Sequence, residues 1–200
     1  MKPLIVFCCS MAAGAALAQS SVWVSSEKDN ALAVIDAATL AVQTPIATCK
    51  RPRHMQLLPG GKQLLVACAE SNAADLIDVA TRKSIRRVPL GDDPEAFDLS
   101  PDGKTLYVSM EDDGALGFVD IASGKMTKQV PVGKEPEGVK TSADGKLVYV
   151  TSEVANMVHV VDVATAKVLH NVKVGKRPRR MSITPDGTEL WVTNELDASV

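Results

Sequence analysis

Pairs of charged residues flank four prolines that lie 42 residues apart, at Pro52, Pro94, Pro136 and Pro178. The pairs run basic, acidic, acidic, basic: Arg51 and Arg53, Asp93 and Glu95, Glu135 and Glu137, Arg177 and Arg179. A guanidinium offers a planar fork of N–H donors that fits a carboxylate or a phosphate. If these segments converge, they form either a polarised pocket for a charged ligand or an Arg–Glu network that only fixes their arrangement. Both roles can coexist.

Other reactive residues form no recognisable catalytic or metal-binding motif. His54 follows Arg53, whereas His159 and His170 lie in later segments of a different repeat. There is no phosphate loop, nucleophile elbow or His-x-x-x-His pair. The paired carboxylates recur with the repeat, as a scaffold predicts, whereas catalysis usually breaks such symmetry. We therefore expect no catalytic residue and no metal ligand, and we expect binding rather than enzyme activity.

Two cysteines beyond the N-terminal region are candidates for a disulfide. Cys49 stands where the other repeats carry glycine, at Gly91, Gly133 and Gly175. Cys68 lies near the end of the second predicted strand of the next unit. Cys49 and Cys68 should therefore both lie at the same rim as the charged pairs. The sequence allows two alternatives: a disulfide between Cys49 and Cys68, or two free thiols. Without a Cys-x-x-Cys-His motif, covalent c-type haem is excluded.

A 42-residue period positions all of these residues. A Pro-Asp-Gly turn or its variant begins at residues 59, 101, 143 and 185, and an aspartate closes an apolar run at Asp36, Asp78, Asp120 and Asp162. Glutamates follow one predicted strand of each unit at Glu27, Glu70, Glu111, Glu153 and Glu195. Such regular self-similarity is typical of a repeat architecture.

Each unit contains four short stretches rich in β-formers. In one unit they are residues 96–99, 106–109, 116–120 and 126–132, separated by Gly, Pro and Asp. Four strands repeated every forty-odd residues indicate a blade of a β-propeller. The fold class is therefore all-β: a β-propeller of four-stranded antiparallel blades.

The propeller model places the charged pairs at the mouth of a central channel. They lie in the links from the outermost strand of one blade to the innermost strand of the next, and His54 starts an innermost strand. The recurrent aspartates such as Asp120 are expected to cap the following turn. The mid-strand aromatics Trp23, Tyr107, Tyr149 and Trp191 are expected to pack between blades, rather than to stack on a sugar.

The N-terminus predicts export. Met1 and Lys2 precede an apolar run that ends at Ala16-Leu17-Ala18, a small-x-small cleavage motif, so residues 1–18 are expected to be a secretory signal peptide. The propeller then occupies 19–200, with repeats near 22–52, 53–94, 95–136, 137–178 and a partial 179–200. The composition, 46% hydrophobic with a net charge of -2, excludes a disordered chain and argues against nucleic acid as a partner. After signal cleavage no membrane association is expected.

Several segments resemble the YVTN family of propeller repeats. They are Leu106-Tyr107-Val108-Ser109, Val148-Tyr149-Val150-Thr151-Ser152 and Leu190-Trp191-Val192-Thr193-Asn194, with Val132-Gly133-Lys134-Glu135-Pro136 as a second motif. The order of the charged pairs is similar to that of the periplasmic propellers associated with PQQ-dependent catabolism. This resemblance implies a periplasmic, non-catalytic binding or interaction scaffold linked to PQQ-dependent alcohol oxidation, with a small molecule or a PQQ-dependent dehydrogenase system as partner.

Two other functions remain open from the resemblance: a lactonase-like hydrolase that uses the channel mouth, and a cell-surface YVTN-repeat adhesion scaffold. No cofactor is expected to be bound, and PQQ enters only through the pathway that the resemblance implies.

The length of 200 residues is short for a closed ring. It accommodates about 4.3 repeats after the signal peptide, whereas seven blades need about 294 residues. We therefore expect an incomplete ring, with the true C-terminus and blade number open.

Overall fold

The computed structural model describes residues 20–200, which fold almost entirely into antiparallel β-sheet. The expected signal peptide, residues 1–18, lies outside the described residues. The strands of the first two sheets are β1 (Ser21–Ser26), β2 (Ala31–Asp36) and β3 (Ile46–Ala47), then β4 (Pro52–Leu57), β5 (Gln63–Cys68), β6 (Ala73–Asp78) and β7 (Lys83–Pro89). A single 3-10 turn, η1 (Ala69–Ser71), separates β5 from β6.

The following sheets repeat this plan. They contain β8 (Pro94–Leu99), β9 (Thr105–Met110), β10 (Ala115–Asp120) and β11 (Lys125–Pro131), then β12 (Pro136–Thr141), β13 (Leu147–Ser152), β14 (Met157–Asp162) and β15 (Lys167–Lys173), and finally β16 (Pro178–Ile183) and β17 (Leu190–Asn194). In each complete sheet the spatial order follows the chain order. The all-β propeller architecture expected from the sequence is thus confirmed.

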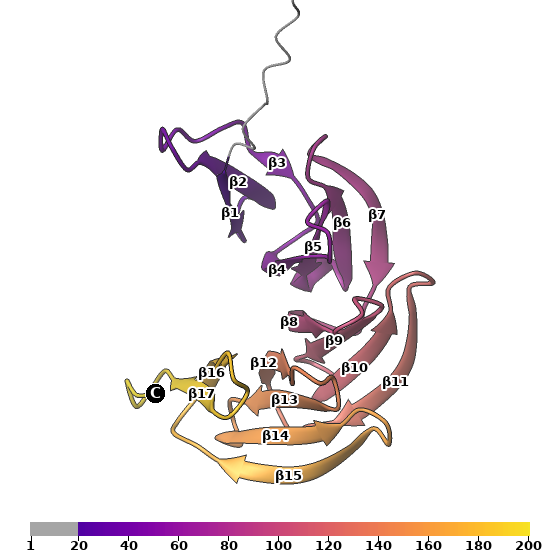
Figure 1. The fold of residues 1–200 in the computed structure, drawn as a ribbon, viewed down its shortest axis with the longest axis vertical. Helices are drawn as coiled ribbons and strands as arrows, with labels where there is room; N and C mark the ends of the chain where they lie inside the picture. The colour runs from indigo at the N-terminus through magenta and orange to yellow at the C-terminus, as the bar shows by residue number, and fades with distance from the viewer. Residues whose placement is uncertain (1–19) are drawn as a thin grey trace, which may run out of the picture.

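The sheets are arranged as blades around an open arc (Figure 1). The first strands of the blades, β4, β8, β12 and β16, contact one another in sequence along the concave side. The last strands, β7, β11 and β15, form the convex edge (Figure 1). The first sheet has three strands and begins with the counterpart of a second strand, so within the described residues the ring is not closed.

An apolar core fills each contact between neighbouring complete blades. The largest cluster contains Leu65, Phe97 and Val108, which come from the second and third sheets. A second cluster joins the third and fourth sheets through Leu116, Phe118 and Val150. Because each blade buries its faces only against its neighbours, stability accumulates joint by joint.

The terminal sheets show what happens where a neighbour is missing from the described chain. Tyr107 is buried in the core between blades, as expected. Trp191 occupies the same repeat position in β17, but 54% of it is exposed. The expectation that Trp191 packs between blades therefore does not hold in this chain, because no described strand covers that face.

Every innermost strand contains a β-bulge at the same place. The pairing of β4 with β5 jumps from Pro52 opposite Cys68 to Met55 opposite Val66, so Arg53 and His54 together oppose one residue. The same shift occurs after Pro94, Pro136 and Pro178. A bulge re-aims side chains relative to the usual alternation of a strand. It therefore sets which residues of an innermost strand face the channel.

Hydroxyl groups on the second strands tie neighbouring blades together below the rim. Ser109 Oγ accepts the N–H of Ala96 at 3.0 Å and donates to the carbonyl of Glu137, in the next blade, at 2.6 Å. Thr151 Oγ1 accepts the N–H of Gly138 at 2.7 Å and donates to the carbonyl of Arg179 at 2.9 Å. These hydroxyls belong to the YVTN-like motifs, so the motif supplies a joint between blades.

The recurrent aspartates cap turns, as expected. The carboxylates of Asp78, Asp120 and Asp162 each accept the backbone N–H of a Ser or Thr three residues later at 2.7 Å. Side-chain and backbone hydrogen bonds from that residue lower the pKa of Asp120 and of Asp162. These residues are structural. Among residues 20–200 no helix is long and apolar enough to cross a membrane.

Candidate functional site

The charged pairs begin in a tightly constrained backbone. The residues that precede the four prolines, Arg51, Asp93, Glu135 and Arg177, all have positive φ angles, of 55°, 46°, 51° and 55°. Side-chain amides stabilise three of these turns: Asn30 Oδ1 accepts the N–H of Arg51 at 2.8 Å, Asn72 Oδ1 that of Asp93 at 3.3 Å, and Asn156 Oδ1 that of Arg177 at 2.9 Å. Non-glycine residues adopt this conformation rarely, and such outliers cluster at functional sites.

One half of the rim is a compact set of ion pairs centred on Arg53. Its guanidinium contacts the Glu95 carboxylate directly and lies 3.1 Å from Glu27 and 3.5 Å from Glu137. Arg51 lies 3.3 Å from Asp93 and 3.6 Å from Glu95. These contacts join four successive blades, from Glu27 after β1 to Glu137 on β12.

The other half is centred on Arg179. This guanidinium lies 3.2 Å from Glu137 and contacts Glu153 directly, and Arg177 lies 2.7 Å from Glu153 and 3.4 Å from Glu195. Because Glu137 meets both Arg53 and Arg179, the two halves form one network, which we call the rim network. Glu135 is exposed and takes no part in the ion pairs of the described residues.

Two carboxyl groups of the rim network are withdrawn from solvent. Glu95 is 0% and Glu137 3% exposed. Burial and the neighbouring Glu137 raise the pKa of Glu95 to about 8, against the opposing effect of Arg53. Burial also raises the pKa of Glu137, although Arg179 opposes it. Burial lowers the pKa of Arg53, but the carboxylates of Glu95, Glu27 and Glu137 outweigh burial and raise it overall. The arginines of the rim network thus only partly offset the cost of burying these two carboxyl groups.

Three acidic groups at the rim, two of them in the rim network, are close enough to share a cation. Oxygens of Asp93, Glu95 and Glu111 all lie within 4.8 Å of one another, a grouping that sequence analysis did not anticipate. Arg51, however, reaches two of these carboxylates. Its guanidinium already supplies the positive charge that a metal ion would bring.

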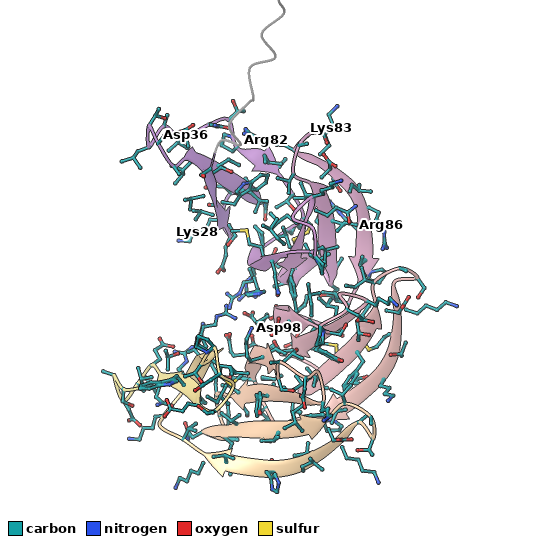
Figure 2. All side chains as sticks on the ribbon, viewed as in Figure 1. Lys28, Asp36, Arg82, Lys83, Arg86 and Asp98 are labelled. Carbon is teal, nitrogen blue, oxygen red and sulfur yellow. A yellow bond between two sulfur atoms is a disulfide. The ribbon has the colours of Figure 1, made fainter. Side chains whose placement is uncertain are left out.

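Below the rim, the innermost strands line a cavity of about 210 Å³. Its polar lining comes from four successive blades: His54 and Gln56 on β4, Asp98 on β8, Lys140 on β12 and Arg180 on β16. Figure 2 shows Asp98 on the concave side of the arc, away from the convex-edge residue Arg86. We call these five residues the channel site.

His54 is the one channel-site residue that the sequence analysis singled out. Its ring lies edge-on to Phe97, with ring centroids 4.7 Å apart. Burial lowers its pKa to about 4, and the positive charges of Arg180 and Lys140 add to this effect. His54 is therefore neutral near pH 7 and offers one N–H donor and one acceptor nitrogen.

The other polar residues of the channel site were missed, although a signal existed. Gln56, Asp98 and Lys140 occupy the same repeat position and differ in every blade, as do His54 and Arg180, whose counterparts are Ala96 and Gly138. Side chains that change from blade to blade on an innermost strand are not needed by the repeat itself. The rim pairs, in contrast, recur with the repeat, which makes them recognisable in the sequence.

The remaining candidates lie elsewhere. Cys49 and Cys68 are joined by a disulfide that ties the link after the first sheet to the end of β5. His159 lies on β14, buried, with Nδ1 2.6 Å from Asn171 Oδ1, and His170 is exposed on β15. Neither histidine reaches the channel site.

Comparisons with solved structures agree with this architecture. The chain matches a structure of hydrazine synthase from Kuenenia stuttgartiensis with a TM-score of 0.79 and 26% identity over 87% of this chain. It matches a functionally unknown protein from Desulfotomaculum acetoxidans with a TM-score of 0.76 and 16% identity over 88%. It spans 52% and 59% of those chains, so it is about half their length. The search of curated proteins finds no match.

A family model provides the assignment. The model of the YNCE-like beta-propeller matches residues 4–91 and again 72–143, so the two matches together run from the N-terminal region into the fourth blade. This agrees with the repeats, the blades and the structural neighbours. The chain belongs to the YNCE-like β-propeller family.

Proposed function

We propose that this protein is an exported, non-catalytic propeller that binds a ligand or a partner protein at the mouth of its channel. The observation that carries the proposal is the channel site. There, polar side chains that vary from blade to blade converge on one cavity, and the side chains of His54, Gln56 and Arg180 make no hydrogen bond or ion pair with residues 20–200. Unpartnered polar groups around a cavity are typical of a binding site.

The rim network supports binding rather than catalysis. Its carboxylates would be the general acids or bases of a lactonase-like hydrolase, but Glu95 and Glu137 are buried and engaged by arginines. A catalytic acid or base must reach the proton that it transfers. The rim network is better suited to holding blades in register and presenting a polarised face.

The compartment and the pathway are part of the same proposal. The N-terminal Ala16-Leu17-Ala18 motif supports export to the periplasm, where a Cys49–Cys68 bridge is chemically stable. The similarity to PQQ-associated propellers supports a role beside a PQQ-dependent alcohol dehydrogenase. One structural neighbour carries the name of an enzyme, hydrazine synthase, which agrees with an association with an enzyme system.

A binding screen tests this function. Thermal shift is measured with PQQ, short alcohols, aldehydes, lactones and small organic acids, together with co-purification of a PQQ-dependent dehydrogenase. We expect at least one interaction that Gln56→Ala weakens, because Gln56 lines the cavity without helping to hold the blades. If none of these compounds and no dehydrogenase binds, the proposal is wrong. If the wild-type protein turns over lactones and Glu95→Gln or Glu137→Gln abolishes that turnover, the function is hydrolysis and not binding alone.

A further inference from the structure

The unpartnered groups of the channel site are mainly hydrogen-bond donors. Arg180 has five N–H donors and no ion pair with any described residue. Gln56 contributes an amide, and the neutral His54 ring contributes one N–H. The site therefore calls for a ligand that accepts hydrogen bonds.

The charges facing the cavity are positive on balance. Lys140 Nζ lies 2.9 Å from Asp98, whose carboxylate also accepts the N–H of Thr141 at 2.9 Å. Asp98 is thus neutralised by its own neighbours. Glu137, on the rim above, is held by Arg53 and Arg179. The charge of Arg180 also lowers the pKa of Glu137, but Arg180 makes no ion pair with any described residue, so its fork is open to a carboxylate.

Apolar groups complete the wall. Phe97, Val139, Met55 and Met181 line the cavity between the polar side chains. A volume of about 210 Å³ is smaller than the cavities that hold drug-sized ligands. The cavity thus has room for a short apolar body and one planar anionic group.

We propose that the channel site binds a small monocarboxylate, with its carboxylate on Arg180, Gln56 and His54 and its apolar body against Phe97 and Val139. This inference rests on the proposed binding function and specifies the ligand class. An anion without an apolar body, such as inorganic phosphate, would use the cationic group but leave the apolar wall unused.

Calorimetric titration of the full chain tests this proposal with butyrate and benzoate, each against its uncharged amide. We expect the acids to bind at least about tenfold more tightly than butyramide and benzamide, because a charge-assisted hydrogen bond is lost in the amides. Arg180→Gln should weaken binding of the acids by at least about tenfold. Arg180→Lys should restore part of it, because charge returns without the fork.

The matched control is Arg87→Gln, which removes an exposed arginine on the outermost strand β7 and should leave acid binding unchanged. Arg180→Gln and Arg87→Gln each alter an exposed side chain, and circular dichroism verifies that both variants fold. Equal affinity for acid and amide, wild-type affinity in Arg180→Gln, or tighter binding of inorganic phosphate would each overturn the inference.

The two proposals fail in distinguishable ways. If an alcohol, an aldehyde or the dehydrogenase binds with dependence on Gln56 while the acids do not, the carboxylate assignment is wrong and the binding function stands. If neither the acids nor any member of the screen binds, both are wrong.

Discussion

At the scale of single residues, Glu95 is the most unusual group in the chain. It is fully buried, in direct contact with Arg53, and beside the second buried carboxyl, Glu137. Burial of its carboxylate costs desolvation energy that the attraction of Arg53 only partly offsets, which is why its pKa is raised, so the contact contributes specificity of arrangement more than stability. We interpret Glu95 as a group that fixes the joint between the second and third blades.

Titration of Glu95 should make stability depend on pH. The ordinary pKa of a glutamate carboxyl is 4.5 and that of Glu95 in the fold is about 8, so the folded chain holds the proton more tightly. The resulting stabilisation is complete below the unfolded pKa and is lost as the pH rises through the folded pKa. We expect the wild-type free energy of unfolding to fall by about 1 kcal/mol or more across this window, and Glu95→Gln to remove most of that fall.

Chemical denaturation at a series of pH values measures this effect. Glu135→Gln is the matched control, because Glu135 is an exposed carboxylate on the same face with no ion pair among the described residues. An unchanged pH slope in Glu95→Gln would show that the carboxyl does not hold a proton in the fold.

At the scale of strands, blades are joined by hydroxyl groups on their second strands. Ser25 donates to the carbonyl of Arg53 at 2.9 Å, and Ser109 and Thr151 make the equivalent bonds further along. Ala67 takes this position in the second blade and carries no hydroxyl. The joint to the third blade therefore depends on the apolar core and on Arg53 with Glu95.

Removal of one bridging hydroxyl should destabilise the fold. Ser109→Ala leaves the buried N–H of Ala96 and the carbonyl of Glu137 without this partner, which costs about 1–3 kcal/mol. Thr193→Val is the control, because Thr193 bonds only within its own blade, to Arg180, and is exposed. Urea denaturation compares the two. Equal losses would mean that the hydroxyl does not join blades.

The Cys49–Cys68 bridge should contribute measurably to stability. It closes a segment with a sequence separation of 19, so its loss should cost about 3 kcal/mol. Intact mass with and without reductant verifies the bond, and the Cys49→Ser, Cys68→Ser double variant measures the cost by denaturation. Two free thiols after non-reducing isolation would contradict the bridge.

The sequence predicted the blades well because their signals are local and periodic. Turn residues, alternating apolar strands and the aspartate caps recur every 42 residues, so the strands near Tyr107 and Phe118 fall where expected. The channel site was harder to predict. Strand alternation allows only one of two adjacent residues to face inward, and the bulge after Pro52 changes that rule for Arg53 and His54. The partners of the rim arginines depend on contacts between blades, which periodicity does not specify.

At the scale of the whole molecule, the described chain is an arc with two uncovered ends. Val22 and Val24 on β1 are 52% and 44% exposed, and Trp191 on β17 is 54% exposed. Blades normally cover such faces for one another, and uncovered strands and apolar faces promote association.

We therefore expect the 200-residue chain, produced alone, to self-associate, and Trp191→Lys to reduce this association. Ile85→Lys is the control, because Ile85 is similarly exposed, at 48%, but lies on the convex edge in β7. Sedimentation velocity over a concentration series measures the effect. A monomer that melts in one cooperative transition would contradict the expectation.

The bulge of the innermost strands also has a consequence for engineering. At each bulge, a residue that recurs with the repeat is followed directly by one that differs from blade to blade, as in Arg53 and His54 or Arg179 and Arg180. The first residue, Arg53 or Arg179, forms ion pairs in the rim network, while the second, His54 or Arg180, lines the cavity. A library confined to positions 54, 56 and 180 would therefore diversify what the channel recognises without disturbing the ion pairs of the rim network or the Lys140–Asp98 pair between β12 and β8. Adjacent residues of one strand therefore have separate roles: one stabilises the contact between blades and the other determines which ligand the channel binds.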